Sequence, residues 1–137
     1  MVRPEVIRRR LQKLDEYLQI LRGLQEYSFE QFVQDPERYG SAERFLQLAI
    51  ETLIDMGNHV IAEFGLGRVD SYRDIPVLLE EHGYIDEEAR ETWIEMIGFR
   101  NILVHDYTEL DREIVYRVLQ QGLEDIAALR RAFAQFL

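Results

Sequence analysis

Residues 100–107 read Arg-Asn-Ile-Leu-Val-His-Asp-Tyr and contain three side chains whose chemistry could be combined. Arg100 carries a planar guanidinium whose N–H groups can bind two phosphate oxygens at once. His105 carries an imidazole, the side chain that most readily exchanges protons near neutral pH. Tyr107 carries a phenol that could accept a covalent group. The segment could therefore handle a phosphate, a proton and a modification, although a helix end with ordinary polar side chains is the simpler interpretation.

Arg100 lies on the apolar side of the helix that we expect to contain it. At about 100° per residue, seven apolar side chains between Ile85 and Val104 fall within an arc of about 120°, and Arg100 falls near its centre. Such a cation needs a charged partner, a cleft or a partner subunit, because an unpaired buried charge is very costly. A purely structural role for Arg100 stays open.

The same helix becomes apolar on nearly all sides after Gly98, where the opposite face carries Asn101 and Ile102 in place of glutamates. This pattern predicts a homodimer with residues 98–104 near the two-fold axis. His105 would diverge from Arg100 if the helix continued, but the residues after it favour caps and turns. We therefore place His105 at the helix end or in the following turn, from which it could swing back toward Arg100.

A period of 3.6 residues dominates the chain, and strand signals are few. Ser28 to Gln31 resemble a capping box that opens a short turn of helix ended by Pro36. We expect an all-α fold, an antiparallel up-down bundle of four long helices plus a short helix. The long helices are predicted from Pro4 to Tyr27, from Gly40–Ser41 to Phe64, from Glu87 to Val104, and from Thr108 or Asp111 to the C-terminus, with the short helix from Tyr72 to Glu81.

Composition limits the possible functions. The chain has 137 residues and no cysteine, and it carries 26 acidic against 16 basic residues, a net charge of −10. The length predicts a single domain, residues 1–137. The acidic surface would repel nucleic acid at long range, which argues against a general coating role but allows a small, locally positive cleft. We expect no signal peptide and no transmembrane helix, and we predict a cytoplasmic protein.

Three further polar residues could support a site. Asp55 and His59, four residues apart in the second long helix, form either a surface pair or groups that orient Arg100 or His105. They are a weak pair of metal ligands, because a metal site needs more ligands and a supporting shell, so we predict no metal and no other cofactor. His82, just before Gly83, is interpreted as a cation at the C-terminal end of the short helix.

The pattern Arg100-x4-His105-x-Tyr107, with the polar Asn101 after the arginine, resembles the signature of the HEPN superfamily. It is most similar to the HepT toxins of HepT/MNT toxin–antitoxin pairs. The stretch 41–59 resembles the second helix of these toxins. Together with the chain length and the helix count, the resemblance covers nearly the whole chain.

This resemblance implies a metal-independent endoribonuclease toxin that cleaves cellular RNA as a homodimer, in a type II or type VII-like toxin–antitoxin pair. One chain supplies one histidine at the motif, whereas two symmetry-related copies would supply a base and an acid together. The catalytic residues would be Arg100 and His105, supported by Asn101, Asp55 and His59.

The resemblance also implies a partner, an MNT-type nucleotidyltransferase antitoxin. In this family the partner transfers AMP to the tyrosine that corresponds to Tyr107. An AMP group beside His105 would bring a phosphate anion and an adenine into the cleft, which would neutralise Arg100 and exclude RNA.

Two other interpretations stay open. The chain could be a non-catalytic, nucleotide-binding partner subunit of a nucleotidyltransferase, because binding a nucleotide uses the same groups. It could also be a helical dimer in which Arg100 and His105 only stabilise the interface. The complete motif favours the ribonuclease over both.

Overall fold

The computed structural model describes residues 3–105 and 110–137. Within these ranges every regular element is a helix, as the sequence predicted, and there is no β-strand. The helices are α1 (Pro4–Leu24), α2 (Phe29–Gln34), α3 (Pro36–Phe64), α4 (Asp74–Glu81), α5 (Glu87–His105), α6 (Arg112–Gln121) and α7 (Leu123–Phe133), followed by the 3₁₀ helix η2 (Ala134–Phe136). None of these helices, among the described residues, is long and apolar enough to span a bilayer.

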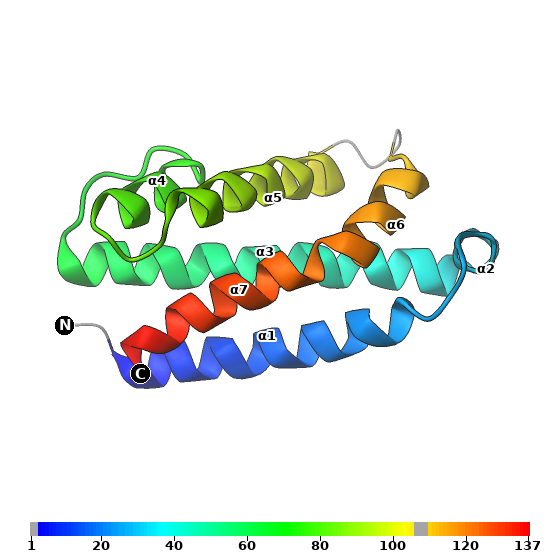
Figure 1. Cartoon of the computed structure of the whole chain (residues 1–137), viewed down its shortest axis with the longest axis horizontal. Helices are drawn as coiled ribbons and strands as arrows, with labels where there is room; N and C mark the ends of the chain where they lie inside the picture. The colour runs from blue at the N-terminus through cyan, green and yellow to red at the C-terminus, as the bar shows by residue number, and fades with distance from the viewer. Residues whose placement is uncertain (1–2, 106–109) are drawn as a thin grey trace.

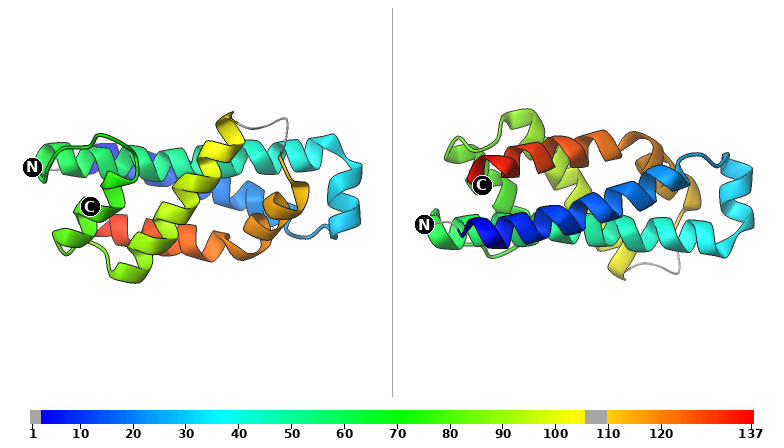
Figure 2. Two further views of the ribbon diagram at one scale, coloured as in Figure 1. Left: turned by 90° about the horizontal axis from the view of Figure 1, so that it is seen from above. Right: turned by 90° about the horizontal axis from the view of Figure 1, so that it is seen from below.

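The helices pack around α3, which contacts each of the other α-helices, α1, α2, α4, α5, α6 and α7. Figure 1 shows α1 and α3 side by side and antiparallel, with α5 on the other side of α3. Seen from above, α5 crosses α3 obliquely (Figure 2). The chain then returns through α6 and α7 and ends beside the start of α1. This crossing brings the C-terminal half of α5 over the middle of α3.

The core is built from the predicted apolar stripes. On α1, five residues spaced three or four apart are all buried: Ile7, Leu11, Leu14, Leu18 and Leu21. On α5, Trp93 is fully buried and meets Phe133 of α7 edge to face, with ring centroids 5.7 Å apart. Burial of each such side chain stabilises the fold by roughly 1.5–3 kcal/mol, so the amphipathic pattern is what fixes the bundle.

The second long helix begins earlier than the sequence predicted. Asp35 accepts a hydrogen bond from the Glu37 N–H through its side chain (2.9 Å), and Pro36 takes the first helical position, so α3 starts there and not at Gly40–Ser41. Its predicted stop is confirmed, since Gly65 has a left-handed φ of 61°.

The last long helix is divided, and the prediction of one continuous helix to the C-terminus was wrong. α6 ends at Gln121 and α7 begins at Leu123, with Gly122 between them. A Cβ at Gly122 would lie 2.7 Å from the Val118 carbonyl oxygen, so this close approach requires glycine. The first helix also ends earlier, at Leu24 and not Tyr27. The Ser28 capping box is present, as predicted, and Asp86 caps the start of α5 by accepting a hydrogen bond from the Ala89 N–H (2.8 Å).

Candidate active site

Three residues of the predicted motif line one open groove. Arg100, Asn101 and His105 project from the C-terminal half of α5, and residues 69–73 of the loop before α4 face them across a depression of about 820 Å³. Asn58 of α3 contributes to the floor. We call this depression the Arg100 groove. Tyr107 lies outside the described residues, so its role as the modified residue stays a prediction.

Arg100 is largely buried and has a carboxylate partner. Its side chain is 15% exposed, and both Nη2 (2.8 Å) and Nε (3.0 Å) donate to Oε2 of Glu51 on α3. The expectation that this cation needs a partner or a cleft is confirmed, because it has both. Glu51 was not singled out from the sequence. The sequence signal that could have found it is its position, since Glu51 is the one charged residue in the run 48–54, Leu-Ala-Ile-Glu-Thr-Leu-Ile.

The Glu51 contact leaves part of the guanidinium available. Gln47 donates to the same Oε2 of Glu51 (3.1 Å), which fixes the carboxylate from the other side. Nη1 of Arg100 donates to the side-chain oxygen of Asn101 (3.2 Å). Three of the five N–H groups of Arg100 are thus engaged, and the other two have no hydrogen-bond partner among the described residues.

His105 is the last residue of α5 and its side chain is exposed. This agrees with the predicted place at the helix end. It lines the same groove as Arg100, so the two side chains do not diverge to opposite sides of the molecule. The groove therefore presents an exposed imidazole and a partly engaged guanidinium to the same ligand, one able to carry a proton and the other able to bind a phosphate.

Asp55 and His59 lie toward α1 and do not line the Arg100 groove. Asp55 pairs with Arg10 (Nη1 to Oδ2, 3.5 Å), and Nε2 of His59 accepts a hydrogen bond from the Arg3 N–H (3.3 Å). Burial raises the pKa of Asp55, Arg10 lowers it, and the negative charge of Glu51 raises it further. Among the described residues, neither Asp55 nor His59 forms a hydrogen bond or ion pair with Arg100 or His105.

The wall of the groove opposite α5 is a short, well-fixed loop. The backbone N–H groups of Asp70 (2.9 Å) and Ser71 (3.1 Å) donate to Oδ2 of Asp74 and hold the pKa of this carboxyl below its ordinary value. Arg68 forms an ion pair with Asp70 (2.6 Å). Asp70 is thus paired with Arg68, and Arg73 also lines the groove, where its positive charge contributes to the lowered pKa of Asp74.

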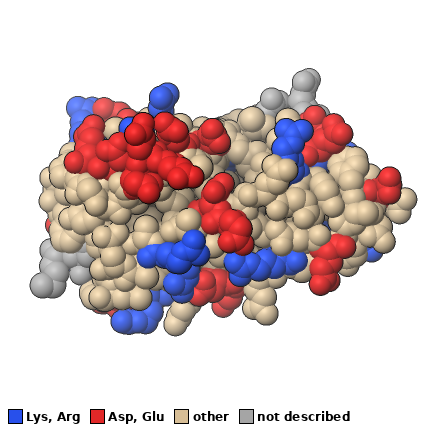
Figure 3. Space-filling view, in the orientation of Figure 1, with Lys and Arg blue, Asp and Glu red and all other residues tan. Residues whose placement is uncertain are grey.

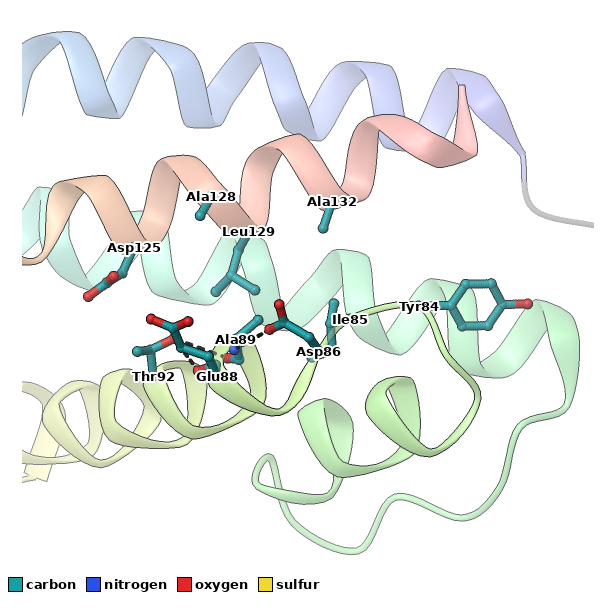
Figure 4. A pocket seen from close by; sticks show the side chains of 10 residues that line it. All are labelled: Tyr84, Ile85, Asp86, Glu88, Ala89, Thr92, Asp125, Ala128, Leu129 and Ala132. Carbon is teal, nitrogen blue, oxygen red and sulfur yellow. Dashed lines mark hydrogen bonds between the residues drawn. The ribbon is translucent and has the colours of Figure 1, made fainter.

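A second cavity lies between the start of α5 and the side of α7 that carries residues 125–132, and it has an acidic lining. Its volume is about 370 Å³, and its charged lining consists of Asp86, Glu88 and Asp125 (Figure 4). Asp86 accepts from the Ala89 N–H, and Thr92 donates to the Glu88 carbonyl, so these groups serve the start of the helix. Three carboxylates without a cation would repel a phosphate, and we assign no RNA contact to this cavity.

Charge is distributed unevenly over the surface. On the face seen in Figure 3, acidic side chains gather over α4 and the start of α5, the segments that carry Glu80, Glu81, Glu87 and Glu88.

No cluster of three or more metal-ligating His, Cys, Asp or Glu side chains occurs in the described ranges. His82, at the end of α4, places Nδ1 2.9 Å from the Leu78 carbonyl oxygen, as a helix-end donor would.

Comparison with known proteins places the chain in a family. The ribonuclease HepT-like family model matches residues 7–133. The chain belongs to this family. The mRNA nuclease HepT of Shewanella oneidensis is 40% identical over 95 residues, which cover 69% of this chain and 71% of that protein. The tRNA nuclease HepT of Aphanizomenon flos-aquae is 25% identical over 138 residues, which cover 99% and 92%.

Solved structures of HepT-type toxins share the fold. The tri-AMPylated Shewanella oneidensis HEPN toxin in complex with MNT antitoxin superimposes with a TM-score of 0.87 at 30% identity, covering 95% of this chain and 97% of that one. A toxin–antitoxin structure with AMP-PNP gives a TM-score of 0.85 at 30% identity, covering 93% and 97%. The resemblance that the sequence motif indicated is confirmed.

Proposed function

We propose that this chain is an endoribonuclease that cleaves RNA without a metal ion, with Arg100 and His105 as its catalytic residues and Asn101 in support. The observation that carries the proposal is the shared groove: Arg100, Asn101 and His105 line it together, in a chain of the ribonuclease HepT-like family. The substrate, cellular RNA, would place this activity in the cytoplasm. The family match over 7–133 also supports a single domain.

The proposed reaction uses the 2′-OH of the RNA itself. This oxygen attacks the adjacent phosphorus, a new O–P bond forms, and the bond from phosphorus to the 5′ oxygen of the next nucleotide breaks. A base accepts the 2′ proton and an acid gives a proton to the leaving 5′ oxygen. His105 would move a proton, and the two unengaged N–H groups of Arg100 would bind the oxygens on which negative charge grows. The products end in a 2′,3′-cyclic phosphate and a 5′-OH.

The reaction calls for an acid and a base, and this supports a homodimer. One protomer offers one His105, so the second proton carrier would come from the partner copy. The surface beside the groove suits such contact: Ile102 is 44% exposed, and nothing approaches within 4 Å of a Cβ built at Gly98. We therefore place residues 98–104 near the two-fold axis, where an exposed apolar side chain would be covered.

We also propose that an MNT-type nucleotidyltransferase antitoxin silences the chain, by AMP transfer to Tyr107. The support comes from the similar toxins, which are described in complex with MNT antitoxin and, in one case, as tri-AMPylated. AMP on Tyr107, two residues after His105, would add a phosphate anion close to Arg100 and fill the groove with adenine. Modification of this kind corresponds to a type VII-like pair, and simple occlusion to a type II pair.

The alternative is a non-catalytic subunit that binds a nucleotide for a nucleotidyltransferase. The same groove, with its guanidinium and asparagine, suits a nucleotide phosphate. The complete motif in a ribonuclease HepT-like chain favours catalysis, because a binding subunit has no need of an exposed histidine beside the cation.

The test is incubation of the purified protein with total cellular RNA, followed by chemical analysis of the fragment ends. The proposal expects new fragments with 2′,3′-cyclic phosphate and 5′-OH ends. Intact RNA under all conditions, together with tight AMP or ATP binding, would support the alternative. Fragments with 5′-phosphate ends would reject the 2′-OH mechanism.

A further inference from the structure

Tyr72, in the loop before α4, is an exposed aromatic residue at the Arg100 groove. The residue is 41% exposed, and the guanidinium carbon of Arg100 lies over its ring, 5.3 Å from the ring centroid. Its hydroxyl forms no hydrogen bond with the described residues. The ring thus contacts Arg100, the cation that would bind the phosphate in the proposed mechanism, while much of Tyr72 faces solvent.

The surroundings of Tyr72 differ from those of the other exposed aromatic residues. Phe29 packs edge to face on Tyr116, with centroids 5.4 Å apart, and Phe64 stacks on Tyr84 at 5.8 Å. These two rings complete aromatic clusters of the fold. Tyr72 has no aromatic neighbour among the described residues, so part of its ring is open to a ring from outside the chain.

The loop holds Tyr72 in place before any ligand arrives. Asp74 accepts the N–H groups of Asp70 and Ser71, and the residues that follow, Ile75 and Pro76, are buried. Ile75 packs so closely on Gly57 of α3 that a Cβ at this glycine would collide with it. A pre-positioned aromatic ring binds a planar ligand at a lower entropic cost than a mobile one.

We propose that Tyr72 is a stacking platform for a nucleobase of single-stranded RNA, next to the phosphate that Arg100 binds. Bases stack on aromatic side chains irrespective of sequence, since every base has a π-face, and cations beside the ring hold the backbone. Arg73 supplies such a cation for a neighbouring phosphate. A duplex keeps its bases stacked on each other, so this platform selects single-stranded substrate. This inference rests on the proposed ribonuclease function and names the form of its substrate.

Binding of uncleavable RNA tests the platform separately from catalysis. The probe is a short, fluorescent single-stranded RNA that carries 2′-O-methyl groups throughout, so that no 2′-OH can attack. Fluorescence anisotropy gives Kd for the parent protein, Tyr72→Ala and Tyr72→Phe. Phe64→Ala is the matched control, because Phe64 is 40% exposed but lies in an aromatic cluster away from the groove. Stacking on an aromatic residue predicts that Kd rises by about fivefold to a hundredfold for Tyr72→Ala. Tyr72→Phe and Phe64→Ala should bind the probe about as tightly as the parent.

A second series of probes replaces one base at a time by an abasic site and keeps each phosphate. If one base stacks on Tyr72, the probe that lacks this base should bind the parent protein more weakly by a similar factor. The same probe should bind Tyr72→Ala almost as well as the complete probe does, because both changes remove the same contact. A Tyr72→Ala variant that binds within about twofold of the parent, or losses that add at every position, would overturn the platform. A parent that binds these probes but never cleaves natural RNA would reject the ribonuclease and keep the platform. A parent that binds no RNA would reject both.

Discussion

Two nitrogens of Arg100 on α5 donate to a single oxygen of Glu51 on α3, Nη2 at 2.8 Å and Nε at 3.0 Å. This contact turns one edge of the guanidinium toward α3 and leaves Nη1 beside Asn101 at the groove. Glu51 thereby does two opposing things. It orients the cation for an incoming phosphate, and its negative charge competes with that phosphate.

The first prediction follows from these two effects. Glu51→Gln keeps the size of the side chain and one acceptor oxygen but removes its charge, so Arg100 is held less firmly and loses its competing anion. We expect kcat to fall by about tenfold while KM stays level or falls. The free energy of unfolding should decrease by about 1–3 kcal/mol, because a charged hydrogen bond is lost. Steady-state kinetics on a short RNA and urea denaturation measure the two quantities.

Asp55→Asn is the matched control for Glu51→Gln. Asp55 lies one turn further along α3 and pairs with Arg10 instead of Arg100. Its kcat should stay within about twofold of the parent. Equal losses of kcat in both variants would mean that general damage to α3, and not the Arg100 contact, lowers the rate.

The second prediction concerns proton transfer. His105→Ala removes the proposed acid–base group from an exposed helix end, so kcat should fall by about 10²- to 10⁴-fold with little change in the thermal midpoint. His59→Ala serves as the control, because His59 contacts the Arg3 backbone outside the groove. RNA cleavage by His105→Ala at half the parental rate would end the assignment of His105.

The third prediction concerns metal. The proposed chemistry uses Arg100 where many nucleases use a divalent cation, so cleavage of a short RNA should keep its rate in EDTA. The same assay with added Mg²⁺ or Mn²⁺ should change the rate by no more than about twofold, through screening of the RNA backbone. Activity that disappears with EDTA and returns with either ion would replace this mechanism by a metal-assisted one.

The sequence was more informative about helices than about the contacts between them. The buried side chains of α1 are the apolar residues that a helical period places on one face. The partner of Arg100 could not be named in this way. Glu51 lies 49 residues away, and the pair depends on where α5 crosses α3. Asp55 and Glu51 occupy the same region of α3, and only the packing decides which of them meets the guanidinium.

The remaining differences have similar causes. Gly122 sits in a continuous amphipathic pattern, and whether such a glycine is tolerated or bends the helix depends on its surroundings. Tyr72 was predicted to begin the short helix, but α4 starts at Asp74 and Tyr72 lies in the loop before it. No period indicates which way a loop side chain points. By contrast, Arg100, Asn101 and His105 were predicted as one group from the resemblance of their motif to the HEPN signature, and they line one groove.

The fourth prediction tests the proposed dimer. Ile102→Lys places a charge on the apolar surface beside the groove, which should weaken dimerisation by more than about tenfold and lower RNA cleavage in parallel. Sedimentation velocity over a range of protein concentrations measures the first effect. Ile20→Lys is the control, because Ile20 is similarly exposed (41% against 44%) but lies on α1. A parent protein that is monomeric at micromolar concentration and cleaves RNA would exclude the dimer as the active form.

The last prediction concerns silencing. Co-expression with the cognate nucleotidyltransferase should raise the mass of the chain by one or more AMP units, all attached to Tyr107, and should suppress cleavage, because the added phosphate competes for Arg100. Tyr107→Phe keeps the ring and removes the acceptor oxygen, so this variant should gain no mass and should keep its activity beside the partner. Intact-mass spectrometry and the RNA assay follow the two outcomes. Tyr116→Phe is a suitable control, since Tyr116 donates its hydroxyl hydrogen to the Tyr27 carbonyl and is tied to the fold. If the partner inhibits Tyr107→Phe as fully as the parent, inhibition occurs by occlusion, and the acidic surface of a chain with a net charge of −10 becomes the expected docking site.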